Sequence, residues 1–361
     1  MLLLLATLFS LTLANSPIQT TYIEFWKTEI GHHSITDWIN DGLMTIFFLL
    51  IGLELEREFY GGELSNIKNA ALPIFGAFGG MIIPAGIFLA FNIGSITQNG
   101  AGIPMATDIA FAIGVLSLLG KRVPSSLTIF LTALAVIDDL GAILVIAFFY
   151  TETISFLNLG VAFCIMGILF ILNRKNVHHL LPYLIGGCLM WYCMMHSGVH
   201  ATITGVLLAF VIPYGNGGTT TSSYRLQSAL HRPVAFVILP LFAIANTCIA
   251  INGDWQEGLT HVNSIGILAG LIFGKPIGIV LFAFLCVQLG IGSLPKDLQW
   301  KHILGAGMLG GIGFTMSIFI TLLAFKNDGE DVITYSKIAI LFASFVSGTL
   351  GFLWLKRTLK P

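Results

Sequence analysis

Charged residues are scarce in this chain. Asp, Glu, Lys and Arg make up 10% of its 361 residues, whereas a soluble domain carries about 25%. Hydrophobic residues make up 56%, so the composition excludes a soluble protein and predicts an all-α polytopic membrane protein surrounded by membrane lipid. The net charge is −1 and no long basic block occurs, which argues against a nucleic-acid partner.

Cysteine is also rare, and the five cysteines that occur lie inside apolar runs without the spacing of a metal site. We expect them to be small buried hydrophobic side chains rather than a disulfide framework. We expect no cofactor, and the chain is not expected to be an enzyme. The five cysteines are Cys164, Cys188, Cys193, Cys248 and Cys286.

Apolar windows predict about twelve transmembrane helices. The first window, Met1–Ala14, is shorter than the roughly 20 residues that a span needs. A signal peptide cleaved after Thr12-Leu13-Ala14 is one alternative, but no basic segment precedes the apolar run, and we interpret the window as a truncated first span. The windows are 1–14, 38–53, 70–94, 104–119, 125–150, 155–172, 181–196, 198–212, 233–251, 262–288, 302–325 and 334–355.

The lysines and arginines between these windows predict the orientation of the chain in the membrane. With the N-terminus inside, thirteen of them lie in one set of loops and three in the other, and the richer side faces the cytoplasm. Both termini are therefore predicted to be cytoplasmic. The thirteen are Arg57, Lys68, Lys121, Arg122, Arg174, Lys175, Arg225, Arg232, Lys296, Lys301, Lys356, Arg357 and Lys360; the three are Lys27, Lys326 and Lys337.

Two windows contain helix-breaking residues at their centres. In the fourth, Pro104 precedes Thr107-Asp108; in the eleventh, a cluster of glycines precedes Phe314-Thr315-Met316-Ser317. Irregular backbone at membrane depth survives only beside a cavity or inside protein. The two windows are seven apart and so cross the membrane in opposite directions, and matched breaks in two inverted units are typical of a transporter's binding site.

Four buried charges are the most informative residues. Asp138 and Asp139 lie in the apolar segment Phe130–Ala147, Asp108 follows the break of the fourth window, and Lys275 is the only charge in Ile265–Cys286. Each charge at this depth costs at least about 2.5–3.5 kcal/mol and is usually retained for function. Such residues are typical of a site that exchanges small cations.

Asp138 and Asp139 are predicted to bind Na⁺ or a proton. A buried carboxylate supplies charge to a hard cation, while hydroxyls such as that of Thr107 and freed carbonyls supply the remaining oxygen ligands. Burial and a second nearby acid also favour proton binding, so one group can hold either a proton or a metal ion. A structural pair, hydrogen-bonded to a neighbouring helix, is the alternative.

The roles of Asp108 and Lys275 have several interpretations. Asp108 either ligates the cation or neutralises the positive dipole end of a facing half-helix. Lys275 pairs with Asp138 or Asp139 until Na⁺ arrives, carries a proton itself, or forms a plain structural salt bridge. Glycine recurs every four residues beside Lys275, which predicts close packing against a neighbouring helix. These glycines are Gly266, Gly270, Gly274 and Gly278.

Four residues near the membrane ends are candidates for cation entry or pH response. Glu54 and Glu58 follow the second window on the cytoplasmic side, where acidic residues either form a solvated helix end or concentrate cations. His200 and His231 lie closest to membrane ends among the histidines, and imidazole titrates near neutral pH. Local hydrogen bonding is the alternative for both histidines.

Five segments of the chain match a known family in order. They are Ala106–Ala112, Ala135–Ala142, Gly198–Thr202, Gly274–Pro276 and Gly311–Phe319, which read ATDIAFA, AVIDDLGA, GVHAT, GKP and GIGFTMSIF. With these segments the chain resembles the bacterial NhaA-type Na⁺/H⁺ antiporters from about residue 10 to 355. One such segment alone would be weak, but five together are highly specific.

This resemblance implies a single transmembrane antiporter domain, 1–361, with twelve helices, the fourth and eleventh crossed and interrupted. Inverted-repeat units are expected at approximately 70–150 and 262–355. It also implies homodimers in the bacterial inner membrane that exchange internal Na⁺ or Li⁺ for external H⁺, electrogenically and with pH dependence, by alternating access. Cation binding falls on Asp108, Asp138 and Asp139, with Lys275 essential or supporting.

The chain departs from the family pattern in three places. The amphipathic lead-in before the first span is missing, and Glu56 stands where a basic residue is common in the Gly-Leu-Glu-x-x-Arg-Glu segment. Gln227-Ser228 replaces a frequent Glu-His pair before His231, so a shifted or blunted pH profile is expected.

Rival functions are less well supported by the sequence. A Na⁺-coupled solute symporter of related fold would need a larger polar cavity than the broken windows offer. An intramembrane aspartyl hydrolase would need a Gly-x-Gly-Asp element, which none of the three acids has. A passive channel would not need buried titratable groups.

Overall fold

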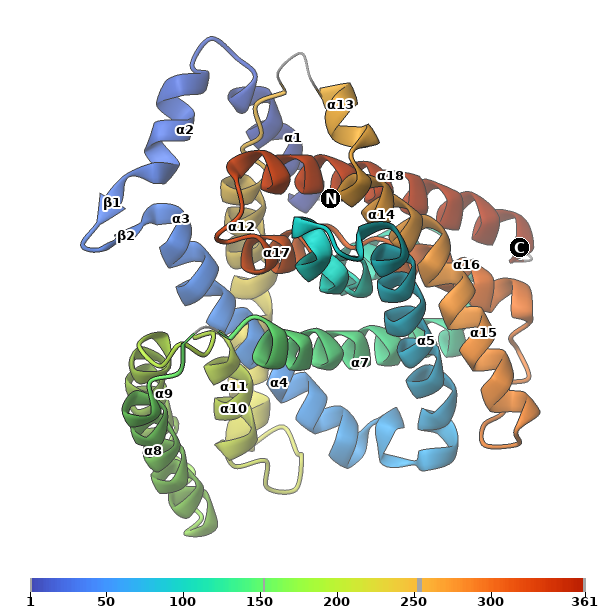
Figure 1. The fold of residues 1–361 in the computed structure, drawn as a ribbon. Coiled ribbons are helices and arrows are strands. Elements are labelled where there is room, and N and C mark those ends of the chain that lie inside the picture. Colours follow the sequence, from blue (N-terminus) through green and yellow to red (C-terminus); the bar gives the residue numbers. More distant parts are fainter. Residues whose placement is uncertain (1, 152, 252–254, 360–361) are drawn as a thin grey trace. The chain divides into compact units, whose positions relative to one another are not determined.

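The computed structural model describes residues 2–151, 153–251 and 255–359, which are mostly helical (Figure 1). Met1 and Lys360, which entered the span and orientation predictions, lie outside the described residues. The chain divides into two compact units, one made of Met1–Gly62 and Ile146–Ala250, the other of Glu63–Val145 and Ile251–Pro361. Each unit is assembled from two stretches of sequence.

The first unit is a helical bundle with one short hairpin, in which Glu29–Ile30 (β1) pairs antiparallel with His33–Ser34 (β2). Its core is apolar and includes Leu53 of α4, Tyr183 of α9 and Leu208 of α10. The helices are α1 (Leu2–Ala14), α2 (Gln19–Lys27), α3 (Ile35–Asp37), η1 (Trp38–Leu43), α4 (Met44–Gly61), α8 (Phe156–Arg174), α9 (Leu180–Met195), α10 (Ile203–Val211), α11 (Ser222–Pro233), η5 (Val234–Ile238) and α12 (Leu239–Asn246).

The second unit holds every buried charge that the sequence singled out. Its helices are η2 (Glu63–Ser65), α5 (Ile67–Asn92), η3 (Ile96–Met105), α6 (Ile109–Ser117), η4 (Gly120–Arg122), α7 (Ser125–Phe149), α13 (Trp255–Thr260), α14 (Val262–Ala269), η6 (Gly270–Gly274), α15 (Lys275–Gln288), α16 (Trp300–Gly310), α17 (Phe314–Ala324) and α18 (Glu330–Thr358). The last residues of α7, from Ile146 on, belong to the first unit. Opposite charges at the two ends of α18, acidic first and basic last, complement its dipole.

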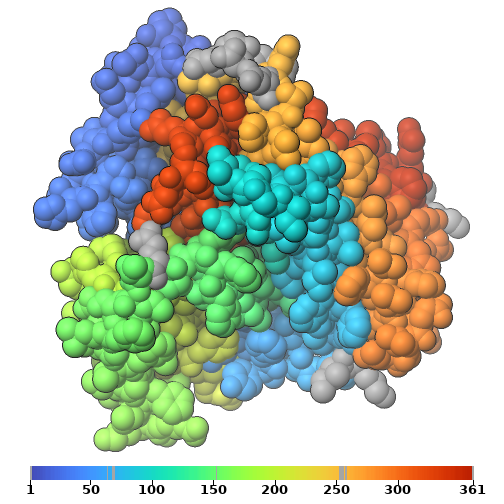
Figure 2. Space-filling view, viewed as in Figure 1, coloured from blue at the N-terminus to red at the C-terminus, as the bar shows by residue number. Residues whose placement is uncertain are grey.

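The predicted glycine stripe packs closely against α5. A Cβ on Gly278 would lie 2.1 Å from the carbonyl oxygen of Gly79, and a Cβ on Gly274 would lie 2.9 Å from Cα of Pro84. Only glycine fits this approach, and the surfaces of α5 and α15 abut in the space-filling view (Figure 2). The close packing predicted for this stripe is confirmed, and it holds Lys275 at the end of η6 against α5.

Helices of spanning length match most of the predicted windows. Within the described residues, eight helices are long and apolar enough to cross a membrane, or up to ten if each of two bent pairs counts as one span. The windows 181–196 and 198–212 correspond to the shorter helices α9 and α10, and 1–14 corresponds to α1, which bends by 116° into α2. The polytopic all-α architecture is confirmed, while the number twelve stays a prediction.

Both predicted helix breaks are present. The 3₁₀ helix η3 ends at Met105, and α6 begins at Ile109 after an extended segment that contains Thr107 and Asp108. The helices α16 and α17 meet at a bend of 48° across Gly311–Gly313. Backbone groups freed at these breaks need other partners, and they meet in the second unit.

The prediction for the cysteines is right about disulfides and wrong about burial. No disulfide joins the five cysteines, but Cys164 and Cys188 are exposed and Cys286 alone among the five is buried. In a chain that spans a membrane, the outer surface of a helix is as apolar as its interior face. An apolar run therefore does not tell which of the two a cysteine occupies.

Candidate functional site

The two helix breaks are hydrogen-bonded to each other. The backbone N–H of Asp108 donates to the carbonyl oxygen of Ile312 at 2.7 Å, and the hydroxyl of Ser317 donates to the carbonyl oxygen of Ile103 at 2.7 Å. Carbonyls at helix C-termini lack intrahelical partners, and each break supplies donors to the other. The family resemblance implied that the two interrupted helices cross, and these hydrogen bonds join their breaks into one polar region.

Asp108 binds the N-termini of two helices at once. Its Oδ1 accepts a hydrogen bond from the N–H of Phe111 at 3.0 Å and so caps α6. Its Oδ2 accepts one from the N–H of Thr315 at 3.2 Å, in the first turn of α17, and another from the Thr315 hydroxyl. The carboxylate is 2% exposed. This geometry favours neutralisation of two positive dipole ends over direct ligation of a cation.

Asp138 and Lys275 form a buried ion pair. The ammonium of Lys275, the first residue of α15, contacts Oδ2 of Asp138 in the middle of α7, and both side chains are fully buried. Lys275 follows the π-helical turn η6, and such turns are frequent at functional sites. The sequence left open which aspartate pairs with Lys275; in this structure it is Asp138.

The two carboxylate oxygens of Asp138 differ in their contacts. Its Oδ1 is buried and has no hydrogen-bond partner among the residues that the structure describes. Its Oδ2 also lies 2.7 Å from the hydroxyl oxygen of Thr107, which lies 2.8 Å from the carbonyl oxygen of Gly310. A threonine hydroxyl has one hydrogen and serves one acceptor at a time. It therefore donates either to Asp138 Oδ2 or to the carbonyl oxygen of Gly310.

Asp139 completes the group of charges. It follows Asp138 on α7, about 100° further round the helix, and is 2% exposed. Its charge interacts with that of Lys275. With Asp138 and Asp139 ionised and Lys275 protonated, the three side chains carry a net charge of −1. A buried net charge is unstable without a counter-ion, and Na⁺ or protons bound at these carboxylates would offset it.

The sequence did not single out Thr315, which belongs to the Asp108 network of the second unit, or Asp41, which lies beside His200 in the first unit. Thr315 appeared only as a polar neighbour of the second break, yet it gives Asp108 two hydrogen bonds. An acid inside the second window was the available signal for Asp41, whose Oδ1 lies 3.9 Å from Nε2 of His200.

Across the described ranges, no cluster of three or more His, Cys, Asp or Glu side chains is suited to a metal ion.

The candidates for pH response fall at two separate places in the first unit. Nδ1 of His231 on α11 lies 3.8 Å from Oε1 of Glu54 on α4. His200 instead lies near Asp41, thirteen residues before Glu54 and about 20 Å away along the helix. Glu58 is half-buried one turn beyond Glu54. The structure therefore joins Glu54 to His231 and separates His200 from both.

Further contacts tie α4 to α11 beside this pair. Ser223 donates a hydrogen bond of 3.3 Å to the buried carboxylate of Glu56. The guanidinium of Arg57 lies over the ring of Tyr224, 5.2 Å from its centre. The acidic segment after the second window is thus packed against α11 rather than freely solvated.

The broken helices and their enclosed charges define a secondary transporter for small cations. A family model described as "Na+/H+ antiporter 1" matches residues 1–355, and this chain belongs to that family. It is 67% identical over 356 residues to "Na(+)/H(+) antiporter NhaA 1" of Flavobacterium johnsoniae, which covers 99% of this chain and 93% of that protein.

More distant proteins agree with this assignment. The chain is 47% identical over 353 residues to "Na(+)/H(+) antiporter NhaA" of Vibrio parahaemolyticus, covering 97% of this chain and 92% of that one. The sodium proton antiporter MjNhaP1 of Methanocaldococcus jannaschii has a similar fold, with a TM-score of 0.56 over 98% of this chain and 90% of that chain, at 14% identity. The antiporter fold therefore extends to proteins with little sequence in common.

Proposed function

We propose that this chain exchanges cytoplasmic Na⁺ or Li⁺ for external H⁺ at Asp138 and Asp139, electrogenically and with pH dependence. It would work by alternating access in the bacterial inner membrane and serve sodium and pH homeostasis. Its twelve spans, with the fourth and eleventh crossed, would leave both termini in the cytoplasm, and the working form would be a homodimer. Membership of the family supports the exchange itself.

One observation carries the assignment of the site. Asp138 binds Lys275 through one oxygen, while its other oxygen is buried without a hydrogen-bond partner among the described residues. A buried carboxylate oxygen without a donor is costly unless a cation or a proton occupies it part of the time. A purely structural ion pair would satisfy both oxygens.

The exchange follows from the charge balance of the site. Na⁺ that binds between Asp138 and Asp139 replaces the ammonium of Lys275 as counter-charge to Asp138. Protons that bind the same carboxylates remove the negative charge and so release Na⁺. The hydroxyl of Thr107 serves as a neutral ligand, since it already lies 2.7 Å from Asp138 Oδ2. Asp108 stabilises the two helix ends and holds the breaks together.

The pH response would come from the contacts between α4 and α11. The pair of Glu54 and His231 is electrostatically favourable only while the imidazole is protonated. Glu58 and Glu54 would also raise the local concentration of cations at the cytoplasmic mouth. His200, beside Asp41, would respond to pH at the other end of α4.

Everted membrane vesicles test the exchange. Addition of Na⁺ or Li⁺ should collapse an imposed proton gradient, and Asp139→Asn should abolish this response while the protein remains in the membrane. The KM for Na⁺ should rise as pH falls, approaching about tenfold per pH unit if a single proton competes for the carboxylates. A KM that does not depend on pH would contradict competition at one site.

A further inference from the structure

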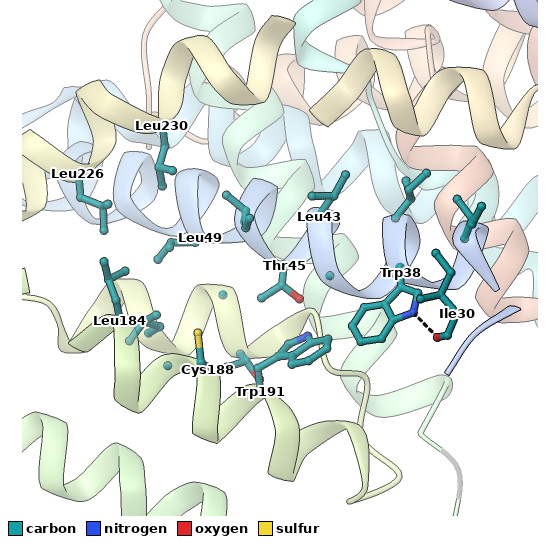
Figure 3. Close-up of a pocket in the computed structure, with 18 residues that line it drawn as sticks. Ile30, Trp38, Leu43, Thr45, Leu49, Leu184, Cys188, Trp191, Leu226 and Leu230 are labelled. Carbon is teal, nitrogen blue, oxygen red and sulfur yellow. Dashed lines mark hydrogen bonds between the residues drawn. The ribbon is translucent and has the colours of Figure 1, made fainter. Parts of the chain in front are cut away.

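The first unit contains an apolar cavity that the ion site does not use. It has a volume of about 830 Å³ and is lined from Trp38 to Leu49 along η1 and α4, and by Cys188 and Trp191 on α9 (Figure 3). Leu226 and Leu230 of α11 line its far end. The long axis of the cavity therefore follows a membrane-spanning helix.

The polar groups in its wall are largely engaged with protein. The indole N–H of Trp38 donates to the carbonyl oxygen of Ile30 at 3.1 Å, and that of Trp191 donates to the carbonyl oxygen of Asp41 at 3.2 Å. The hydroxyl of Thr45 also donates to the Asp41 carbonyl. Thr204 has a buried hydroxyl without a partner in the described part of the chain.

One hydroxyl cannot keep water in such a cavity, because a buried water needs two to four polar partners. Apolar cavities of about 150 Å³ stay dry and take up molecules such as benzene, and this cavity is roughly five times larger. Its walls belong to helices that cross or border the hydrocarbon of the membrane. The acyl chains of membrane lipids are therefore the apolar molecules nearest to this cavity.

The dimensions of the cavity match one leaflet of a bilayer. Trp38 and Leu49 are eleven residues apart, which corresponds to about 16 Å of helix at 1.5 Å per residue. Half of the hydrocarbon core measures about 15 Å. Trp38 and Trp191 lie at one end, and tryptophans gather at the level of lipid headgroups, where the ring is apolar and the N–H is hydrogen-bonded.

We propose that this cavity binds one acyl chain of a phospholipid, with the glycerol end of the lipid at Trp38 and Trp191 and the methyl end at Leu49 and Leu230. In the orientation proposed above, this lipid belongs to the outer leaflet. The binding depends on shape and apolar contact and not on the ion chemistry of the second unit. A failure of lipid binding would therefore not count against the transport function, and a failure of transport would not count against lipid binding.

Gly42 offers a way to fill the cavity without disturbing its walls. It lines the cavity, and a Cβ added there would meet no atom within 4 Å. Leucine is also a better helix former than glycine. Gly42→Leu should therefore fold and occupy the space of several methylenes. Gly160→Leu on α8 is the matched control, because a Cβ at Gly160 also meets no atom within 4 Å and Gly160 does not line the cavity.

The probe is a phospholipid with a brominated acyl chain, which quenches indole fluorescence on contact. It is titrated into delipidated protein in detergent, in a variant that keeps only Trp38 and Trp191. We expect quenching that saturates near one lipid per protomer and is at least about tenfold weaker in Gly42→Leu, since each lost methylene contact weakens binding. Gly160→Leu should bind as the parent does.

Quenching that rises linearly without saturation, or saturates equally in Gly42→Leu, would overturn the proposal. So would an absence of quenching combined with a change of oligomeric state in Gly42→Leu, because a second copy of the chain would then fill the cavity. Cys188→Phe is a second test variant, used if Gly42→Leu does not fold. Its ring narrows the cavity from the opposite wall. It should weaken the same saturable binding, and unchanged binding would again count against the acyl-chain site.

Discussion

The ammonium of Lys275 contacts the carboxylate of Asp138, although 137 residues separate them in the sequence. Three helices bring them together: α7 carries the acid, and the tight packing of α15 on α5 fixes the base. Because both side chains are fully buried, each depends on the other for its charge. We propose that this pair is the element whose state changes when Na⁺ or a proton binds.

Removal of one partner of this pair should be more damaging than removal of both charges. Lys275→Met leaves an uncompensated buried carboxylate and should destabilise the protein by about 3–5 kcal/mol, as other broken buried pairs do. Lys275→Met combined with Asp138→Leu should recover most of that loss, although neither variant should transport. Thermal unfolding of the purified protein in detergent gives the comparison. Equal stability of the single and the double variant would mean that the pair does not exist in the membrane.

Substitution of Asp108 should lower the stability of the protein, because two helix ends lose their counter-charge, and should leave the affinity for Na⁺ unchanged. Asp108→Asn keeps one acceptor oxygen but loses the charge that faces two helix N-termini, so it should cost about 1–2 kcal/mol of stability. Since a compensating residue does not bind the cation, the KM for Na⁺ should stay within about twofold of the parent value. Unfolding and transport in proteoliposomes measure the two effects. A KM raised tenfold or more would identify Asp108 as a direct ligand instead.

His231 should set the pH profile with little effect on stability. Its contact with Glu54 is partly exposed, and exposed pairs contribute about 0–1 kcal/mol. If the protonated pair holds α4 and α11 in the inactive arrangement at low pH, His231→Gln should transport at lower pH than the parent. The pH dependence of Na⁺ transport in everted vesicles checks this, with the loop substitution His178→Gln as control. A profile that does not move would place the pH response elsewhere.

Close packing of α5 and α15 should tolerate no side chain at Gly278. A Cβ there would lie 2.1 Å from the carbonyl oxygen of Gly79, and backbone atoms cannot yield as a flexible side chain does. Gly278→Ala should therefore destabilise the protein by about 1–3 kcal/mol. Gly86→Ala on α5 is the control. A Cβ at Gly86 meets no atom within 4 Å, so this variant should be neutral or slightly stabilising. Similar melting temperatures for the two variants would contradict the packing described here.

The sequence predicted which residues form the site better than it predicted how they are arranged. Asp108, Asp138, Asp139 and Lys275 stood out because charge is rare at membrane depth, and glycine and proline located both breaks. The choice between Asp138 and Asp139 as partner of Lys275 could not be predicted. It depends on the rotation of α7 relative to α15, and consecutive residues differ by about 100° around a helix.

Some structural features left a weaker signal in the sequence. Neutralisation of a facing helix end by Asp108 was one of two alternatives from the sequence, because no local pattern shows that α17 begins beside α6. The exposure of Cys188 and the cavity beside it depend on which apolar face meets lipid. Helices bounded by lipid lack the alternation of polar and apolar faces that orients a helix in a soluble protein.

In the proposed mechanism, the buried acids Asp138 and Asp139 accept either Na⁺ or protons. Titration of purified protein with NaCl in a weakly buffered alkaline solution, followed with a pH indicator, tests it most directly. We expect Na⁺ binding to release protons, and we expect the double variant Asp138→Asn, Asp139→Asn neither to bind Na⁺ nor to release protons. Na⁺ binding to the parent protein without any release of protons, at every pH where binding occurs, would contradict it.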